Sequence, residues 1–184
     1  MDNRRLIIDA AKGLFWHRGY STTSPKQVMT EAGVGQGSFY HHFPAKADLG
    51  QEVVRENGRD LVASVRAAME GLPTGRERLA AFLGSAGDAL GGCRIGGFAY
   101  DAGIVDEPGL REPLGAAFNE LTGLLEQVVR EAQDDGTVSP KLDPATTAAT
   151  LLAVVEGAFV LARATGRQAS ADAATAGALA LLDG

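Results

Sequence analysis

Residues 24–46, SPKQVMTEAGVGQGSFYHHFPAK, constrain the fold of this chain more than any other stretch. They have the pattern of two short helices joined by a glycine turn. Ser24 precedes Pro25, and Gln27 stands at the third helical position, which is the pattern of an N-cap with a capping box. Gly33 is suited to the left-handed conformation that ends a helix. The sequence therefore predicts a helix that starts after Ser24 and a turn that begins at Gly33.

The second short helix has one apolar face and one polar face. Phe39 and Phe43 lie four residues apart and share the inward face, so the other side chains point elsewhere. Polar side chains on an exposed helix can reach base edges or phosphates, and a glycine there allows close approach of the backbone. We therefore expect this stretch to bind DNA. The predicted contact residues are Ser24, Lys26, Gln36, Gly37, Ser38, Tyr40, His41 and Lys46.

This stretch resembles the DNA-binding head of the tetracycline-repressor (TetR) family, whose pattern joins A-G-V and a small triplet to an aromatic F-x-x-K-x-x-L run. The matching residues are Ser24, Ala32, Gly33, Val34, Ser38, Phe39, Tyr40, His42, Phe43, Lys46 and Leu49. Two positions depart from the family, because Gly35 and Ala45 stand where hydroxyl-bearing caps are common. We expect the N-terminal turns of the helices after these two residues to be less stable.

The resemblance implies an all-α fold of about nine helices. Residues 1–47 would form a three-helix helix-turn-helix head, and residues 48–184 a helical bundle for effector binding and dimerisation. The implied function is a ligand-responsive transcriptional regulator, most often a repressor. It would bind a palindromic operator on double-stranded DNA as a homodimer and be released by a small-molecule effector, with no cofactor.

Three other interpretations compete with this one. A plain helical hairpin would use the aromatic residues as core and leave the histidines on the surface. A DNA-binding regulator without an effector shares every feature of the head. An enzyme is not expected, because no nucleophile, base and orienting group stand at a suggestive spacing. Metal binding by His41 and His42 is not expected either, since neighbouring helical residues diverge by about 100°.

Charge is divided unevenly along the chain. The formal net charge is −6, but residues 1–47 carry +3 and all three histidines, whereas the remainder carries −9. This division fits a basic head on an acidic body, although solubility alone would also explain it. The single cysteine allows no internal disulfide, and the charged N-terminus is unlike a secretory signal, so we expect a cytoplasmic location.

Two helices flank the predicted DNA-binding stretch. The apolar spacing between Arg4 and Arg18 predicts a helix that braces the head, and Arg4 and Arg5 could either touch the DNA backbone or remain solvated. A long helix from Ala47 to about Met69 would start at the DNA and end in the body. The resemblance implies that this rod transmits the effect of a bound ligand.

The glycine-rich stretch GGCRIGGFAYDAG lacks the spacing of a nucleotide-binding loop. A short helix from about Phe98 to Val105 follows, and the resembling family places this segment beside its effector cavity. The candidate effector-binding residues are Phe82, Phe98, Tyr100, Phe118 and Phe159. Core packing explains Phe98 and Tyr100 equally well. Cys93 is either a small buried hydrophobe or a thiol that senses oxidants or electrophiles, and only Arg94 stands near enough to lower its pKa.

The helix predicted after Pro144 is apolar on several faces, so it must be buried on more than one side. A membrane span is not expected, because Asp143, three threonines and Glu156 leave no run of about 18 strongly apolar residues. A last helix over Ala171–Leu182 is rich in alanine and glycine. In the resembling family the last two helices form the dimer interface, and we expect the same here.

Overall fold

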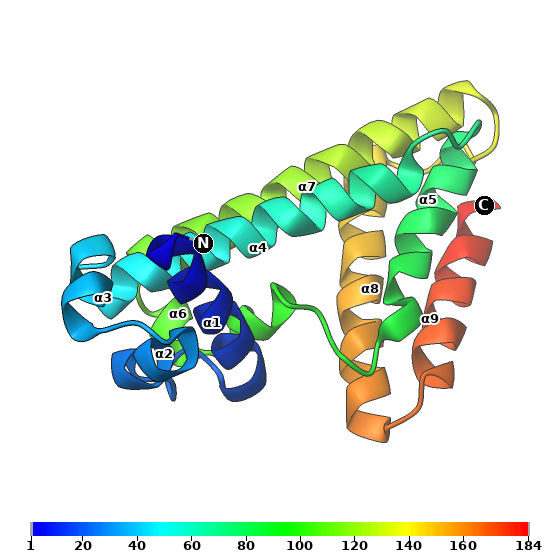
Figure 1. Cartoon of the computed structure of the whole chain (residues 1–184). Helices are drawn as coiled ribbons and strands as arrows, with labels where there is room; N and C mark the ends of the chain where they lie inside the picture. Colours follow the sequence, from blue (N-terminus) through cyan, green and yellow to red (C-terminus); the bar gives the residue numbers. More distant parts are fainter. Residues whose placement is uncertain (1, 184) are drawn as a thin grey trace. The chain divides into compact units, whose positions relative to one another are not determined.

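The computed structural model describes residues 2–183, and every regular element among them is a helix (Figure 1). This confirms the predicted all-α fold with nine α-helices. They are α1 (Asn3–Arg18), α2 (Pro25–Ala32), α3 (Gln36–His42), α4 (Lys46–Met69), α5 (Gly75–Gly84), α6 (Ala102–Val105), α7 (Pro108–Asp134), α8 (Pro144–Thr165) and α9 (Ala169–Ala180). Three short 3-10 helices, η1 (Ser85–Asp88), η2 (Gly96–Tyr100) and η3 (Leu181–Asp183), complete the set.

The chain folds into two compact units. The first contains the residues up to Asp60 together with Arg94–Ala117, and the second contains Leu61–Cys93 together with the residues from Phe118 onwards. The first unit is larger than the head predicted for residues 1–47. It includes the beginning of α4 as well as η2, α6 and the beginning of α7, so a segment from the middle of the sequence packs with α1 to α3.

The ends of the short helices follow their local capping chemistry. The Ser24 hydroxyl accepts a hydrogen bond from the Gln27 N–H at 3.3 Å, and the Gln27 side chain accepts one from the Ser24 N–H at 2.7 Å, which confirms the capping box. Gly33 ends α2 with φ at 66°. Gly35 provides no side-chain cap for α3, as expected. At α4, the Asp48 carboxylate accepts from the Ala45 N–H at 2.8 Å and offsets part of the missing cap.

Aromatic side chains hold the head of the first unit together. Phe39 and Phe43 are both buried, with ring centroids 6.3 Å apart. Tyr20, after the end of α1, packs edge-on against Phe15 with ring centroids 5.2 Å apart. Leu49 of α4 is fully buried in the same unit. Burial of these residues fixes which face of α3 points inward.

Helix α7 contains a proline in its first two turns. Pro113 lacks an N–H, so it cannot donate to the carbonyl of Gly109 as a helical residue normally would. The side-chain amide of Gln51 on α4 donates to that carbonyl at 2.9 Å instead. The two helices also approach closely at Gly58, where an added Cβ would lie 2.7 Å from the Cβ of Ala117. Tertiary contact with α4 thus allows a helix to continue through a proline.

The second unit has its own apolar core, formed by the end of α4 and by α5, α7, α8 and α9. In α8, Asp143 caps the N-terminus by accepting from the Thr146 N–H at 2.9 Å, and Gly166 ends the helix with φ at 66°. Helices α8 and α9 pack side by side (Figure 1). The small residues predicted for this region therefore serve close helix packing within one chain.

Among the described residues, α8 alone is long and apolar enough to cross a membrane by length and composition. The expectation that Glu156 and the threonines would interrupt any such run was wrong, because the many apolar residues between them outweigh their polarity. Buried core helices of soluble proteins pass the same test. Only a third of the apolar window is buried, which leaves much of α8 exposed.

Candidate nucleic-acid interface

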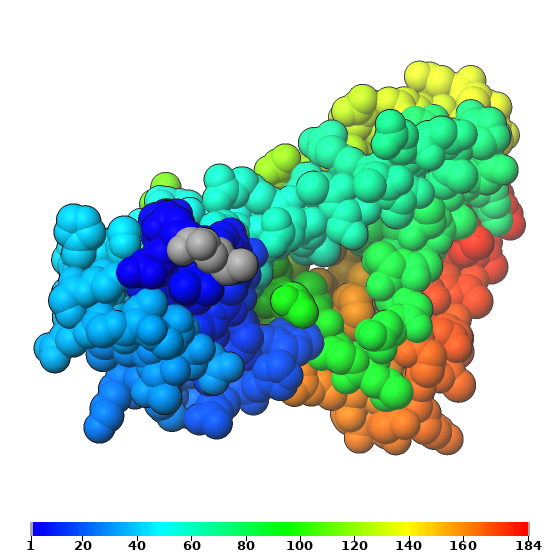
Figure 2. Space-filling model, viewed as in Figure 1, coloured from blue at the N-terminus to red at the C-terminus, as the bar shows by residue number. Residues whose placement is uncertain are grey.

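Helix α3 separates its inward and outward side chains cleanly. Phe39 is fully buried, whereas Gln36, Gly37 and His41 are exposed and Tyr40 is 42% exposed. Ser38 is partly exposed on the same outer side. Figure 2 shows residues of this stretch, in light blue, at the molecular surface. A helix anchored by buried aromatic rings and bearing polar outer residues has the form of a DNA-reading helix.

Two predicted contact residues lie at the start of α2. Ser24 is exposed, but its hydroxyl already takes part in the capping box with Gln27, and its oxygen lies 3.0 Å from the Gln27 side-chain oxygen. Lys26 is exposed on the first turn of the helix. No ion pair involves Lys26 among the described residues, so its ammonium can contact a phosphate without breaking an existing ion pair.

Lys46 is the first residue of α4, and its ammonium is not fully extended into solvent. The Nζ atom lies 4.1 Å from the centroid of the Tyr20 ring, a cation–π contact. Burial lowers the pKa of Lys46, and attraction to Asp101 only partly opposes this effect. The cation is thus held close to the α4 N-terminus, where it can still add positive charge for an anion.

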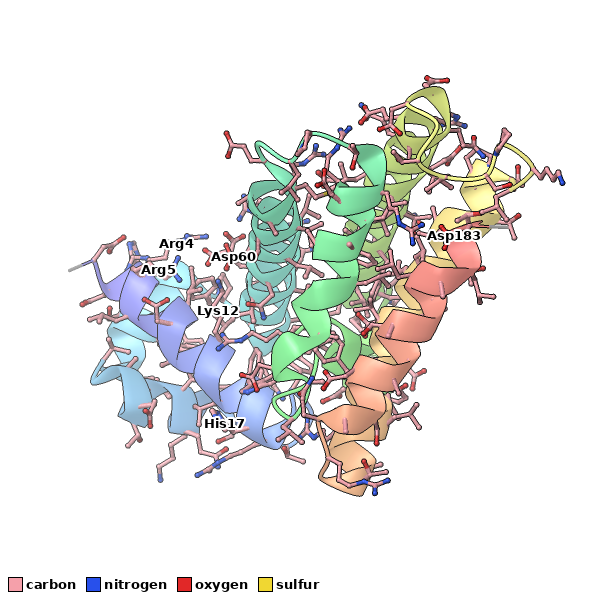
Figure 3. The ribbon with its side chains drawn as sticks, turned by 90° about the vertical axis from the view of Figure 1, so that its right-hand side faces the viewer. Arg4, Arg5, Lys12, His17, Asp60 and Asp183 are labelled. Atoms are coloured by element: carbon pink, nitrogen blue, oxygen red, sulfur yellow. The ribbon has the colours of Figure 1, made fainter. Side chains whose placement is uncertain are left out.

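Three cations of α1, namely Arg4, Arg5 and Lys12, form ion pairs with acidic residues. Figure 3 shows Arg4, Arg5, Lys12 and Asp60 close together at one side of α1. The ion pairs from α1 to α4 are Arg4–Glu52 at 3.3 Å, Arg5–Glu56 at 2.9 Å, Lys12–Glu56 at 3.0 Å and Lys12–Asp60 at 2.7 Å. The sequence left open whether Arg4 and Arg5 touch the DNA backbone or remain solvated. The structure shows another role, because both arginines join α1 to α4 through ion pairs.

Glu56 is the centre of this network, and its side chain is largely buried. Burial alone would raise its pKa, but hydrogen bonds and attraction from Lys12 and Arg5 outweigh burial and lower the pKa below its usual value. Arg5 also hydrogen-bonds Asp9 and lowers the pKa of that carboxyl. The network is therefore charged at neutral pH and stabilises the packing of α1 against α4.

Sequence reasoning missed two side chains that make long-range contacts in the first unit, Asn3 and Asp101. The side-chain amide of Asn3 donates to the Ser38 hydroxyl at 3.0 Å. The carboxylate of Asp101 accepts from Ser21 and also caps α6 through the Gly103 N–H. The Asp-x-Gly pattern at the start of α6 was a local signal for the cap. No sequence signal pointed to Asn3, because its partner is 35 residues away.

The predicted effector-binding residues are divided between the two units. Phe82 is buried in the core of the second unit, and Phe118 and Phe159 pack against the same core. Phe98 is buried in the first unit instead. Tyr100 is 81% exposed, which is unlike the wall of a cavity. Only Phe82, Phe118 and Phe159 therefore share one core, that of the second unit.

The second unit also contains an open groove of about 560 Å³. Its lining comes from α4, α5 and α7, with Met69 and Val128 at its apolar part and Arg66, Glu70, Arg78 and Glu131 among its charged residues. None of the predicted effector-binding residues lines this groove. Phe82, Phe118 and Phe159 of the same unit therefore lie outside the lining of the groove.

Cys93 is half-buried and its side chain hydrogen-bonds Glu156 on α8. Burial raises the pKa of Glu156, and the bond from the thiol only partly opposes that rise. A carboxyl partner does not favour a thiolate, and the Arg94 guanidinium stands over Trp16 with its carbon 5.6 Å from the ring centroid. The surroundings therefore favour the packing role of Cys93 over the sensor role.

Comparison with known proteins identifies the family. Residues 7–53 match the family described as bacterial regulatory proteins, tetR family, and residues 75–178 match the tetracyclin repressor-like C-terminal domain. The HTH-type transcriptional regulator LmrA of Bacillus subtilis is 30% identical over 167 residues, which is 87% of this chain and 86% of LmrA. The chain belongs to the TetR family. This TetR-family protein is accordingly a DNA-binding transcriptional regulator and not an enzyme.

Other relatives agree with this assignment. The HTH-type transcriptional repressor DhaR of Mycobacterium sp. is 27% identical over 161 residues, covering 85% of the TetR-family chain and 80% of DhaR. The crystal structure of the reduced form of Escherichia coli NemR superposes with a TM-score of 0.89 at 19% identity, covering 97% of this chain and 95% of that one. The structural similarity to NemR establishes the fold of both units.

Proposed function

We propose that this TetR-family protein is a repressor that binds a palindromic operator as a homodimer and leaves it when a small-molecule effector binds. The observation that carries the proposal is the outward display of Gln36, Ser38 and Tyr40 on α3, while Phe39 and Phe43 fix the opposite face in the core. This display supports insertion of α3 into the major groove.

The outer residues of α3 suit different parts of DNA. Gln36 and Ser38 carry the groups that hydrogen-bond base edges. At Gly37 an added Cβ would meet nothing within 4 Å, so the helix surface there is open to a close-lying DNA backbone or base. Tyr40, His41 and the nearby lysines supply donors for phosphates, which position the protein without reading sequence.

The exposed apolar surface of the last helices supports dimerisation. Val160 and Leu161 of α8 are 48% and 49% exposed, and Leu181 of η3 is 74% exposed. Large apolar side chains exposed on both elements suit an interaction surface. A second copy is the partner that fits a palindromic operator, because a two-fold dimer presents one α3 to each half-site. Covering α8 in this way also removes any need for a membrane, in keeping with a cytoplasmic protein.

The core of the second unit supports an apolar effector with one hydrogen-bonding group. Phe82, Phe118 and Phe159 supply aromatic surface, and Glu156 supplies a carboxyl inside largely apolar surroundings. An effector that favours the non-binding arrangement by about 1–3 kcal/mol would lower operator occupancy severalfold or more. The effector is bound and released unchanged in this proposal.

Selection from randomised duplexes with the full-length protein tests the DNA part. We expect an enriched palindrome, two chains per duplex, and an affinity that falls steeply with salt. Sedimentation at micromolar concentration should find a dimer, and a monomer would contradict the interface. In a thermal-shift screen, a compound that raises the melting temperature should also weaken operator binding. Compounds that stabilise the protein but leave operator affinity unchanged would contradict the effector part.

A further inference from the structure

Asn3 joins the beginning of α1 to the outward face of α3. It is the first residue of α1, and its Nδ2 atom lies 3.0 Å from the Oγ atom of Ser38, the third residue of α3. Both residues belong to the first unit. A side chain from outside the helix-turn-helix segment therefore controls a hydroxyl on the helix proposed to read DNA.

The position of Asn3 is fixed from both sides along the chain. Asp2 caps α1 by accepting from the Arg4 N–H at 3.2 Å. The Arg4 guanidinium stands over the ring of Phe43, at 5.5 Å from its centroid, and lies 3.3 Å from the carboxylate of Glu52. These contacts hold the first turn of α1 against the end of α3 and against α4. The amide of Asn3 is thereby kept beside Ser38 before any DNA arrives.

The bond from Asn3 decides how the Ser38 hydroxyl is used. A serine hydroxyl has one proton to donate and two lone pairs that accept. A helical hydroxyl often donates to the carbonyl four residues earlier, as Thr30 does to Lys26 at 3.0 Å. Within the described residues, Ser38 has no such bond to its own helix. Since Asn3 donates into one lone pair, the proton of Ser38 is left to donate outward.

We propose that Asn3 is a specificity-determining residue, because its amide holds the Ser38 hydroxyl as a hydrogen-bond donor toward the operator bases. A donor at this position matches N7 and O6 of guanine, N7 of adenine and O4 of thymine. The amino groups of cytosine and adenine are themselves donors and meet only the one lone pair that Asn3 leaves open, so they fit this position less well. This inference rests on the proposed function, since it requires α3 to lie in the major groove. Asn3 acts as a positioning residue and need not touch DNA.

Asn3→Asp gives the sharpest test because the two side chains have the same shape. A carboxylate can only accept, so Ser38 would turn its proton toward residue 3 and present lone pairs to the DNA. The operator is first obtained by selection from randomised duplexes with the wild-type protein. Duplexes that carry each base pair at each position are then compared by fluorescence anisotropy. We expect the preference at one position of each half-site to shift toward base pairs whose amino group faces Ser38.

Asn3→Ala should weaken the preference at the same position without reversing it. The Ser38 hydroxyl would then rotate freely, and we expect discrimination there to fall about fivefold, which corresponds to one ordinary hydrogen bond. Asn3→Asp adds a negative charge that lowers affinity for all duplexes alike. The readout is therefore the ratio of affinities between bases at one position, and not the affinity itself.

Two controls separate this role from a structural one. In a Ser38→Ala background, the Asn3 variants should leave every base ratio unchanged, since the hydroxyl is gone. Asp2→Ala loosens the first turn of α1 but keeps the Asn3 amide, so it should lower the melting temperature more than it changes the base ratios.

The outcomes distinguish the inference from the proposed function. Base ratios that stay unchanged in Asn3→Asp and Asn3→Ala, with operator binding retained, overturn the role of Asn3 and leave the repressor proposal standing. Altered ratios that persist in the Ser38→Ala background overturn it too, because the effect then bypasses Ser38. If the wild-type protein enriches no duplex sequence, the proposed function fails and this inference fails with it.

Discussion

The carboxylate of Asp101 accepts a hydrogen bond from the Ser21 N–H at 2.9 Å and another from the Ser21 hydroxyl. The two residues are 80 positions apart in the sequence, yet they lie in the same compact unit. Asp101 also accepts from the Gly103 N–H at 3.0 Å and so starts α6. One side chain therefore joins the turn after α1 to the beginning of α6, which places the middle of the sequence against the DNA-binding helices.

Asp101→Ala should destabilise the protein by about 1–2 kcal/mol, because it removes a helix cap and leaves the Ser21 groups without their acceptor. Urea unfolding monitored by circular dichroism would measure the loss. Asp106→Ala is the matched control, since Asp106 is an exposed aspartate at the other end of the same short helix. Equal losses in the two variants would contradict the special role of Asp101.

Gly58→Ala should destabilise the protein although alanine is the better helix former. The new Cβ would lie 2.7 Å from the Cβ of Ala117, and the resulting overpacking outweighs the gain in helix propensity. We expect a net loss of up to about 2 kcal/mol. Gly123→Ala on α7 meets nothing within 4 Å and should instead stabilise by about 0.5–1 kcal/mol. If Gly58→Ala and Gly123→Ala shift the melting temperature in the same direction, the close approach of α4 and α7 at Gly58 is refuted.

Lys12→Met should weaken the packing of α1 against α4. The Lys12 side chain is only 12% exposed and bridges Glu56 and Asp60, so the variant leaves a largely buried carboxylate with fewer partners. We expect a loss of about 1 kcal/mol that shrinks at high salt. Arg130→Met removes an exposed pair with Glu126 and should cost less than about 0.5 kcal/mol. Chemical denaturation at low and high salt compares them, and indistinguishable losses would rule out the network.

Glu156→Gln should make the protein more stable at neutral pH. Burial raises the pKa of Glu156 in the folded state above its ordinary value of 4.5. Below pH 4.5 the carboxyl is protonated in both states. Between pH 4.5 and the higher pKa of the folded state, the unfolded state releases the proton more readily, so the free energy of unfolding falls as pH rises. The difference in unfolding free energy between variant and wild type should therefore grow above pH 4.5 and then level off. A difference that is constant with pH would show that Glu156 is not buried as described.

Gln36→Ala and Lys26→Ala should affect DNA binding in different ways. Removing the Gln36 amide should relax the base preference at one operator position, because amides read base edges. Removing the exposed Lys26 cation should weaken binding to all sequences and lower the salt dependence by about one phosphate contact. Titrations of matched and mismatched duplexes at several salt concentrations separate the two effects. If both variants change base preference and salt dependence in the same way, the separate roles of Gln36 and Lys26 are contradicted.

Local signals predicted the helix boundaries well. The Ser24 capping box and the left-handed Gly33 are both present, and Phe39 and Phe43 take the inward face of α3. Such features depend on residues a few positions apart, so a single sequence records them directly. Pro113 shows the limit of this reasoning, since a proline normally ends a helix and here a side chain from α4 replaces the missing donor.

Contacts between distant residues were not predictable in the same way. Phe98 and Tyr100 were candidates both for an effector cavity and for core packing; Phe98 is buried in the first unit, whereas Tyr100 is exposed. Aromatic spacing indicates that a side chain is buried, but it does not say which partner buries it. The same holds for Arg5, whose choice of Glu56 depends on how α1 crosses α4.

The sequence alone determined the helices, their caps and the buried face of α3, because these follow from hydrogen bonds and apolar spacing within a few residues. The tertiary structure decided that Asp101 meets Ser21, that Asn3 meets Ser38 and that residues 94–117 pack with the head. These pairings depend on chain segments folding back on one another. Their cost in conformational entropy is met by the whole core together, so no local pattern encodes them.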